Sequence, residues 1–323
     1  MIDRAPAHTS NRVPSVSVAV VCICGSEHLT RCLEGLRRQE GVRPFRVIVC
    51  YDPSLEGIDE VARRFPEAIV SSHPAERTPL ELSAAAVRLC ESDVLLLTED
   101  HCIPSANWVH AMLAARAPGR AVIGGRIEIR SGASAVDWAF YYVDFFRYAA
   151  PVTNGPSPTL TVCNVAYERA QLEAIRDLWS TSFEEPAVHN ELRRRFGALW
   201  LTAESEVTMR RSVSFAEGLR ERYAFGRIFG HTRVARVSTS RRWMYAALAA
   251  ALPLLLLGRM TAKAMMSSRL FVSFVRAFVP VLALVLCWSW GELLGYVTKR
   301  PPRRLVLAVE QSPGRSASPR ADA

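Results

Sequence analysis

Short apolar runs alternate with amphipathic segments over the first hundred residues, and this alternation limits the fold more than any other feature of the sequence. The residues between the runs repeat leucine or alanine at helical spacing, which predicts helices. Such strand–helix alternation predicts an α/β fold with a mostly parallel sheet and helices on both faces. The predicted strands are Val16 to Ile23, Phe45 to Tyr51, Ala68 to Ser71 and Val94 to Thr98.

Polar residues follow two of these predicted strands. Asp52 follows the second strand, and Glu99, Asp100 and His101 follow the fourth. Parallel strands end at the same edge of a sheet, where open α/β folds bind their ligands. One acid there can accept a hydrogen bond from a base or ribose, and another can hold a metal on a diphosphate. The sequence contains neither Gly-x-Gly-x-x-Gly nor Gly-Lys-Ser/Thr, so a cation and basic side chains are expected to hold the phosphates.

The middle of the chain predicts further helices and two more strands, the first of them over Ala121 to Ile129. Seven aromatic residues lie between Trp138 and Tyr148 in a predicted helix over residues 135–150. Two interpretations stay open for this helix: packing on the sheet, or a face that touches lipid or a lipid-linked acceptor. A strand is expected over residues 159–163. Glu184 and Glu185 open a later helix, where acids are also ordinary N-terminal residues.

The charge pattern narrows the classes of partner. The net charge is +9, and arginines crowd the second half of the chain. A basic surface beside apolar segments fits an anionic membrane or a phosphate-bearing ligand. We expect no nucleic acid partner, because no nucleic-acid-reading motif accompanies the charge. The eight cysteines lack the spacing of a zinc site, and we interpret them as small buried side chains in a reducing compartment.

Two apolar blocks end the chain, at residues 243–258 and 277–291. Each is shorter than the roughly 20 residues of a full span. Basic residues outside both blocks favour a hairpin with its two ends in the cytoplasm. The connecting segment is also basic, with Arg259, Lys263 and Arg269, which is less favourable for a spanning hairpin. A shallow or re-entrant pair of helices in the inner leaflet is therefore one alternative, and a soluble helical subdomain is another. The predicted divisions are a disordered lead (1–14), a catalytic domain (15–232), a membrane-associated helical hairpin (233–298) and a disordered basic tail (299–323).

Five features follow one another in a distinctive order. They are Val16 to Ile23, Asp52, Leu97 to Pro104, Cys163 to Arg169, and Phe183 to Glu185. Together they resemble bacterial family 2 glycosyltransferases with the GT-A (Rossmann-like) fold. The resemblance covers roughly residues 15–230, and an apolar carboxyl-terminal pair is frequent in membrane-associated members.

The resemblance implies transfer of a sugar from a UDP- or GDP-sugar to an acceptor hydroxyl, with inversion. It implies a lipid-linked or saccharide acceptor and a role in polysaccharide or glycolipid assembly. The expected location is the bacterial inner membrane, with the catalytic domain in the cytoplasm. A non-catalytic membrane-bound scaffold or binding subunit is the alternative. A nucleotidyltransferase is a third hypothesis, but the glycine-rich, lysine-bearing loop expected of it is missing after the first strand.

The resemblance also implies roles for single residues. The family uses an Asp-x-Asp motif to bind ribose and a divalent metal, and alignment on Pro104 puts Glu99 and His101 at its two acidic positions. His101 and Asp100 are then the implied ligands of a divalent cation, for which histidine favours Mn²⁺ over Mg²⁺. The implied catalytic base is Glu185 first and Glu184 second. The residues implied to bind the nucleotide sugar are Asp52, Glu99, Asp100, Arg210 and Arg222. Asn164 and Trp108 are implied in the wall of the donor or acceptor pocket.

Overall fold

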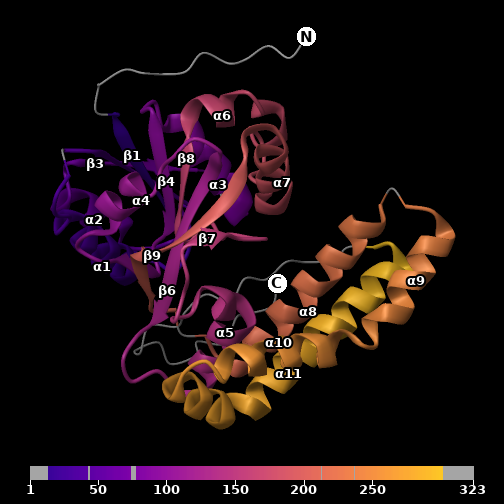
Figure 1. The fold of residues 1–323 in the computed structure, drawn as a ribbon. Helices are drawn as coiled ribbons and strands as arrows, with labels where there is room; N and C mark the ends of the chain where they lie inside the picture. Colours follow the sequence, from indigo (N-terminus) through magenta and orange to yellow (C-terminus); the bar gives the residue numbers. More distant parts are fainter. Residues whose placement is uncertain (1–13, 43, 74–77, 212, 236, 301–323) are drawn as a thin grey trace, which may run out of the picture.

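A computed structural model describes residues 14–42, 44–73, 78–211, 213–235 and 237–300. The predicted disordered ends lie outside these ranges, apart from Pro14, Lys299 and Arg300. The described chain forms a sheet covered by helices and an elongated group of helices that extends away from it (Figure 1).

Nine strands in the described ranges form one sheet in the order β3-β2-β1-β4-β8-β6-β9-β5, with β7 paired to β9. The first four in this order are parallel, as predicted, whereas β8 is antiparallel to both β4 and β6. The strands are β1 (Val16–Cys22), β2 (Arg46–Tyr51), β3 (Ala68–Ser72), β4 (Val94–Glu99), β5 (Cys102–Pro104), β6 (Arg120–Ile129), β7 (Gly155–Pro156), β8 (Val165–Glu168) and β9 (Ala198–Met209).

The prediction of a strand over residues 159–163 is wrong, because the structure has no strand there. The Asn164 N–H donates to the Thr161 carbonyl at 3.1 Å and closes a turn there. The strand β8 therefore starts only at Val165.

Helices cover both faces of the sheet. Along β1, Val18 and Val20 pack in a core with α1, α2, α4 and α5, while Ala19 and Val21 pack in a second core with α3, α6 and α7. The two-faced arrangement predicted from the alternation is thus confirmed. These helices are α1 (Ser26–Arg37), α2 (Ile58–Arg64), α3 (Pro79–Leu89), α4 (Trp108–Ala114), α5 (Ala135–Phe145), α6 (Arg169–Glu173) and α7 (Glu185–Phe196).

The aromatic segment forms α5, which packs between the sheet and the carboxyl-terminal helices. The Tyr141 hydroxyl donates to the Ile127 carbonyl at 2.6 Å. The Tyr142 hydroxyl donates to the Leu270 carbonyl at 2.6 Å, and its ring lies edge-on to Phe274 at 5.1 Å. The interpretation as a packed helix is confirmed, because six of the seven aromatic side chains are buried.

The carboxyl-terminal part of the chain folds into four helices, here called the helical unit. They are α8 (Phe215–Val234), α9 (Thr239–Ala249), α10 (Leu252–Ala264) and α11 (Ser268–Thr298). In Figure 1 they form an arm beside the sheet, with α5 at the junction. The unit is larger than the hairpin predicted over residues 233–298, because α8 also packs along α11. The helix α11 is long and apolar enough to cross a membrane, and α9 with α10, bent by 54°, would pass the same test together.

Two glycine pairs bring α8 and α11 into backbone contact. They are Gly226 and Gly230 on α8, and Gly291 and Gly295 on α11. A Cβ atom at Gly226 would lie 2.2 Å from the Trp288 carbonyl oxygen. The helices can approach this closely only because neither carries side chains at the crossing.

We predict that Gly226→Ala destabilises the fold, whereas Gly258→Ala does not. The added methyl at residue 226 meets backbone that cannot rotate away, which costs about 1–3 kcal/mol. Gly258 lies in α10 with no atom within 4 Å of its would-be Cβ, so alanine there is neutral or stabilising by up to about 1 kcal/mol. Urea unfolding followed by circular dichroism measures both variants, and equal midpoints would contradict the close crossing.

Candidate active site

The carboxyl ends of β1, β2 and β4 meet at one edge of the sheet. In the strand register, Tyr51 and Glu99 both lie beside the end of β1. Asp52 follows Tyr51 and therefore shares this edge with Glu99, as the sequence predicts. The Asp52 carboxylate accepts from the Ser54 N–H at 2.8 Å and is partly exposed, so it can accept a further hydrogen bond from a ligand.

The Asp100 side chain holds the loop that follows β1. Its Oδ2 accepts from the N–H groups of Cys24 (2.8 Å) and Gly25 (3.1 Å) and from Cys22 Sγ (3.2 Å). Gly25 has a φ of 105°, a region that favours glycine. Among the described residues, the buried Asp100 Oδ1 has no hydrogen-bond partner. Burial raises the pKa of this carboxyl above its usual range.

His101 is buried beside Glu99. Its Nδ1 lies 3.4 Å from Glu99 Oε2 and has no hydrogen-bond partner in the described part of the chain. Cys163 Sγ donates to the same carboxylate oxygen at 3.4 Å. Burial lowers the pKa of His101 well below its usual value and raises the pKa of Glu99 to about 7. His101 is therefore neutral at physiological pH, which is the form that binds metals.

Two groups of side chains at this edge could hold a metal ion. One comprises Cys24, Asp100 and His101, and the other comprises His101, Cys102 and Cys163. Within each group the ligand atoms lie within 4.8 Å of one another. Asp100 Oδ1 and His101 Nδ1, which lack hydrogen-bond partners, offer one oxygen and one nitrogen donor. This donor set fits a divalent cation and suits Mn²⁺ better than Mg²⁺.

Glu184 and Glu185 lie in different surroundings. Glu184 is exposed, whereas Glu185 begins α7 and its Oε2 accepts from the Val162 N–H at 2.8 Å. Its Oε1 lies 4.0 Å from His189 Nδ1, beyond hydrogen-bond distance. Burial, and then the charge of Glu99, raises the pKa of Glu185 to about 8. Glu185 is thus a carboxyl group that titrates near neutral pH and whose pKa is affected by the charge of Glu99.

Trp108 and Asn164 contact each other in the interior. Trp108 Nε1 donates to Asn164 Oδ1 at 2.7 Å, and Asn164 Nδ2 donates to the Arg126 carbonyl at 2.7 Å. Both side chains are almost fully buried. The contacts join α4 to β6 and to the start of β8. A place for either residue in the pocket wall stays a prediction.

The two predicted phosphate-binding arginines differ in position. The Arg210 N–H donates to the His101 carbonyl at 2.8 Å, which holds this residue next to the strand-end acids. Arg222 lies on α8, where its guanidinium binds both Asp144 oxygens, at 2.5 and 2.9 Å. Phosphate binding stays a prediction for both, and in Arg222 the guanidinium is engaged by Asp144.

The sequence analysis missed a buried charge network beside these residues. Arg211 donates to both Glu221 oxygens, at 3.2 and 2.8 Å. Glu221 lies 3.5 Å from Arg222, which in turn binds Asp144. After burial, the charge of Arg211 is the next cause that lowers the pKa of His101, so the network reaches the site. Two consecutive arginines directly after a strand were the signal that could have found it.

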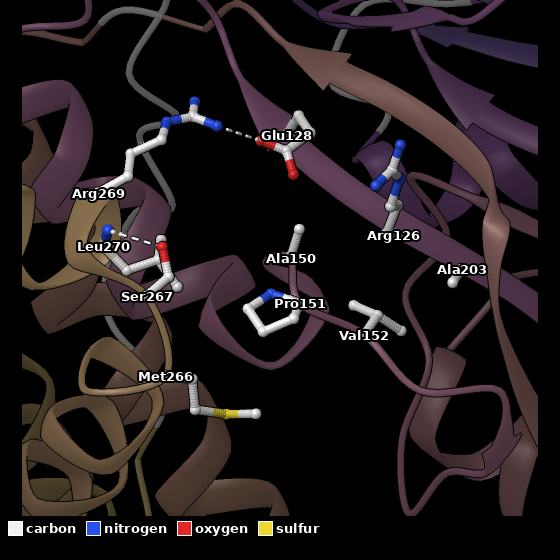
Figure 2. Close-up of a pocket in the computed structure, with 10 residues that line it drawn as sticks. All are labelled: Arg126, Glu128, Ala150, Pro151, Val152, Ala203, Met266, Ser267, Arg269 and Leu270. Atoms are coloured by element: carbon white, nitrogen blue, oxygen red, sulfur yellow. Dashed lines mark hydrogen bonds and ion pairs between the residues drawn. The ribbon is translucent and has the colours of Figure 1, made fainter.

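A cavity of about 580 Å³ opens between β6 and the start of α11 (Figure 2). Arg269 Nη1 binds Glu128 Oε2 at 3.0 Å across it, and Arg126 pairs with Glu206. The charged pairs and the apolar side chains give this cavity a mixed lining. It is lined by Arg126, Glu128, Ala150, Pro151, Val152, Ala203, Met266, Ser267, Arg269 and Leu270.

Comparison with known proteins finds a family match in the first part of the described chain. Residues 17–176 match the sequence model of glycosyl transferase family 2. This segment belongs to that family. The matched residues of the glycosyltransferase include the strand-end acids and the Asn164 region, and they end before α7. No curated protein sequence matches the chain.

One of two similar solved structures supports the GT-A fold of this glycosyltransferase. The mannosyltransferase PcManGT from Pyrobaculum calidifontis, in complex with GDP-Man and Mn²⁺, is 15% identical, with 90% of each chain covered and a TM-score of 0.54. TarS residues 1–349 from S. aureus is 12% identical, with 84% of this chain and 90% of that chain covered and a TM-score of 0.47. At these identities the likeness to PcManGT shows the fold alone.

The raised pKa of Glu185 predicts a pH-dependent stability. Between about pH 4.5 and 8 the folded state holds a proton on Glu185 that the unfolded state has lost, so the free energy of unfolding falls as pH rises through this window. Glu185→Gln mimics the protonated form and should flatten that slope. Urea midpoints at pH 5 and pH 8 measure the effect, with Glu184→Gln as the exposed control. An unchanged slope in Glu185→Gln would assign the proton to another group.

Proposed function

We propose that this chain transfers a sugar from a nucleotide diphosphate sugar to an acceptor hydroxyl with inversion at the anomeric carbon. The observation that carries the proposal is the Glu185 carboxyl. It is fixed by the Val162 N–H, has a pKa of about 8, and lies within the electrostatic influence of Glu99 at the strand edge. A carboxyl with a pKa near the working pH is suited to general base catalysis.

Glu185 would act through the oxygen that the backbone leaves available. Because Oε2 is held by Val162, Oε1 is the atom that can accept the proton of the acceptor hydroxyl. The deprotonated oxygen then attacks the anomeric carbon from the side opposite to the leaving nucleotide diphosphate. A single displacement of this kind inverts the configuration. The proton stays on Glu185 until solvent removes it.

The strand-end residues would bind the donor. Asp52, which is partly exposed, and Glu99 would accept from the base and ribose, and Arg210, whose N–H donates to the His101 carbonyl, would bind the phosphates. The fold that PcManGT shares, in a complex with GDP-Man, supports a UDP- or GDP-sugar as the donor.

A divalent cation would be held by Asp100 Oδ1 and His101 Nδ1, which have no hydrogen-bond partner among the described residues. When bound, it would neutralise charge on the leaving diphosphate. The chain's own contribution is to present these two atoms from the turn between β4 and β5, which Asp100 Oδ2 ties to the loop after β1. The Mn²⁺ in the PcManGT complex supports the preference for Mn²⁺ over Mg²⁺.

The proposed location is the cytoplasmic face of the bacterial inner membrane. The exposed apolar side chains of the helical unit support attachment to lipid. A lipid-linked or saccharide acceptor, and a role in polysaccharide or glycolipid assembly, follow from that location. The mixed lining of the cavity beside α11 suits a hydroxyl-rich acceptor.

A non-catalytic scaffold or binding subunit is the second candidate. The observation that favours it is that Asp100 Oδ2 already accepts hydrogen bonds from the loop after β1, so this oxygen has a structural role. A subunit that kept only the fold would bind no nucleotide sugar.

Glu185→Gln should lower the rate of sugar transfer by about 10²–10⁴-fold while donor binding survives, because the amide cannot accept the proton. The matched control is Glu184→Gln, one residue away and exposed, which should stay close to the wild-type rate. In the wild-type protein the rate should rise with pH up to about pH 8, as Glu185 loses its proton. Rates are measured by nucleotide diphosphate release. Wild-type turnover in Glu185→Gln would remove this residue from the base role.

Mn²⁺ should tighten donor binding about tenfold in the wild-type protein, because it offsets the diphosphate charge. His101→Ala should lose this response, whereas His110→Ala, an exposed histidine on α4, should keep it. Calorimetry with a panel of UDP- and GDP-sugars, with and without Mn²⁺, makes the measurement. Failure of the wild-type protein to bind any of them would favour the scaffold.

A further inference from the structure

The helical unit carries a continuous stretch of exposed apolar side chains on α11. From Ala277 to Val297 the residues with oxygen-bearing polar side chains are Ser289, Glu292 and Tyr296, and all three are buried. The outward face of the helix therefore offers no charge to water over this length. Its exposed apolar residues are Phe271, Val272, Val275, Phe278, Val279, Leu286, Trp290 and Val297, and neighbouring ones on α9 and α10 are Trp243, Met244, Leu248, Leu254 and Leu255. These residues are here called the apolar face.

The charge around the apolar face has one sign. Between Tyr223 and Arg300 the sequence has eleven arginine or lysine residues and a single acid, Glu292. Glu292 is buried, where it accepts from Trp288 Nε1 at 2.8 Å and lies 3.9 Å from Arg233. The solvent-facing charge of the unit is thus positive. A basic border around apolar side chains is complementary to a bilayer that contains anionic lipid.

The helix α11 is tied at both ends to charged parts of the protein. Near its start, Arg269 binds Glu128 of β6 at 3.0 Å. At its end, the Thr298 hydroxyl oxygen accepts from Arg227 of α8 at 3.2 Å. A helix of 31 residues is about 46 Å long, which exceeds the roughly 30 Å of a hydrocarbon core. A spanning placement would carry at least one of these tied ends across the bilayer.

The partner helix α8 makes a spanning placement still less favourable. It packs along α11 through the glycine pairs, so the two helices must enter any membrane together. On α8, Glu221 and Arg222 belong to the buried charge network, and Arg220 is exposed. Close glycine crossings occur between membrane helices, but a partner with this charge belongs outside the hydrocarbon.

We propose that the helical unit lies in the plane of one leaflet of an anionic bilayer, with the apolar face of α11, α10 and α9 in the acyl region and α8 turned toward water. Both ends of α11 are then on the same side of the membrane. Trp243 and Trp290, exposed on this face, sit at the depth of the headgroups, where tryptophan is favoured. The inference rests on the proposed membrane location and specifies its geometry.

Flotation of the full-length protein with vesicles tests the surface. We expect stronger binding to phosphatidylcholine vesicles that contain phosphatidylglycerol than to phosphatidylcholine alone. Val279→Glu, at a residue that is 74% exposed in the middle of α11, should lower binding about tenfold or more. Ile69→Glu is the matched control on β3, 52% exposed, and should leave binding unchanged. Equal binding of the two variants would overturn the assignment of this face.

Thiol labelling tests the single-leaflet geometry. Ser268→Cys and Thr298→Cys place a thiol at either end of α11, and a membrane-impermeant maleimide is applied to sealed membranes before and after permeabilisation. Labelling of the unsubstituted protein gives the background from its own cysteines. We expect both ends to be labelled from the same side, and labelling from opposite sides would overturn the inference while leaving the membrane location intact. Failure of the wild-type protein to bind any vesicle would overturn both the membrane location and the single-leaflet geometry. The proposed sugar transfer is tested separately, by its rate in solution.

Discussion

The buried Asp100 carboxylate fixes the sheet edge on which the candidate site is built. It accepts hydrogen bonds from two partly buried N–H groups in the loop before α1. Two such hydrogen bonds offset part of the cost of burying the acid, whose pKa is raised by that burial. Because Asp100 lies between Glu99 and His101, the same contact holds both neighbours at the edge, where Glu99 meets Cys163.

A second set of charges connects this edge to the helical unit. Arg211 follows β9 and reaches Glu221 on α8, and Arg222 continues the contact to Asp144 on α5. Breaking one member of a buried network leaves another charge unpaired, which is far more costly than losing a surface pair. The positions of α8 and α5 relative to the site are therefore coupled to its electrostatics. The helical unit is not an independent anchor but part of the structure that sets the charge near His101.

The sequence predicted the parallel half of the sheet and the shared edge of Asp52 and Glu99, because both depend on local periodicity. The family resemblance ranked Glu185 before Glu184 as the base, and this role stays a prediction; in the structure Glu185 is half-buried against the Val162 N–H and Glu184 is exposed. The sequence could not predict the start of β8, which is set by a turn, or the start of α11 at Ser268, well before the apolar block 277–291. The two consecutive arginines after β9 are a visible local pattern, but the pairing of Arg211 with Glu221 depends on a tertiary contact that this pattern does not specify. The glycines at the α8–α11 crossing became informative only once the two helices were seen to meet.

The order Glu-Asp-His has a physical explanation in this geometry. One oxygen of the middle residue, Asp100 Oδ2, is occupied by the loop after β1, whereas the side chains of Glu99 and His101 lie 3.4 Å apart. Two aspartates in their place would carry two negative charges toward a diphosphate. Glu99, with a pKa of about 7, and a neutral His101 carry less. In the proposed mechanism, less of the charge of a bound cation would be needed to cancel that of the protein, and more of it would act on the leaving diphosphate.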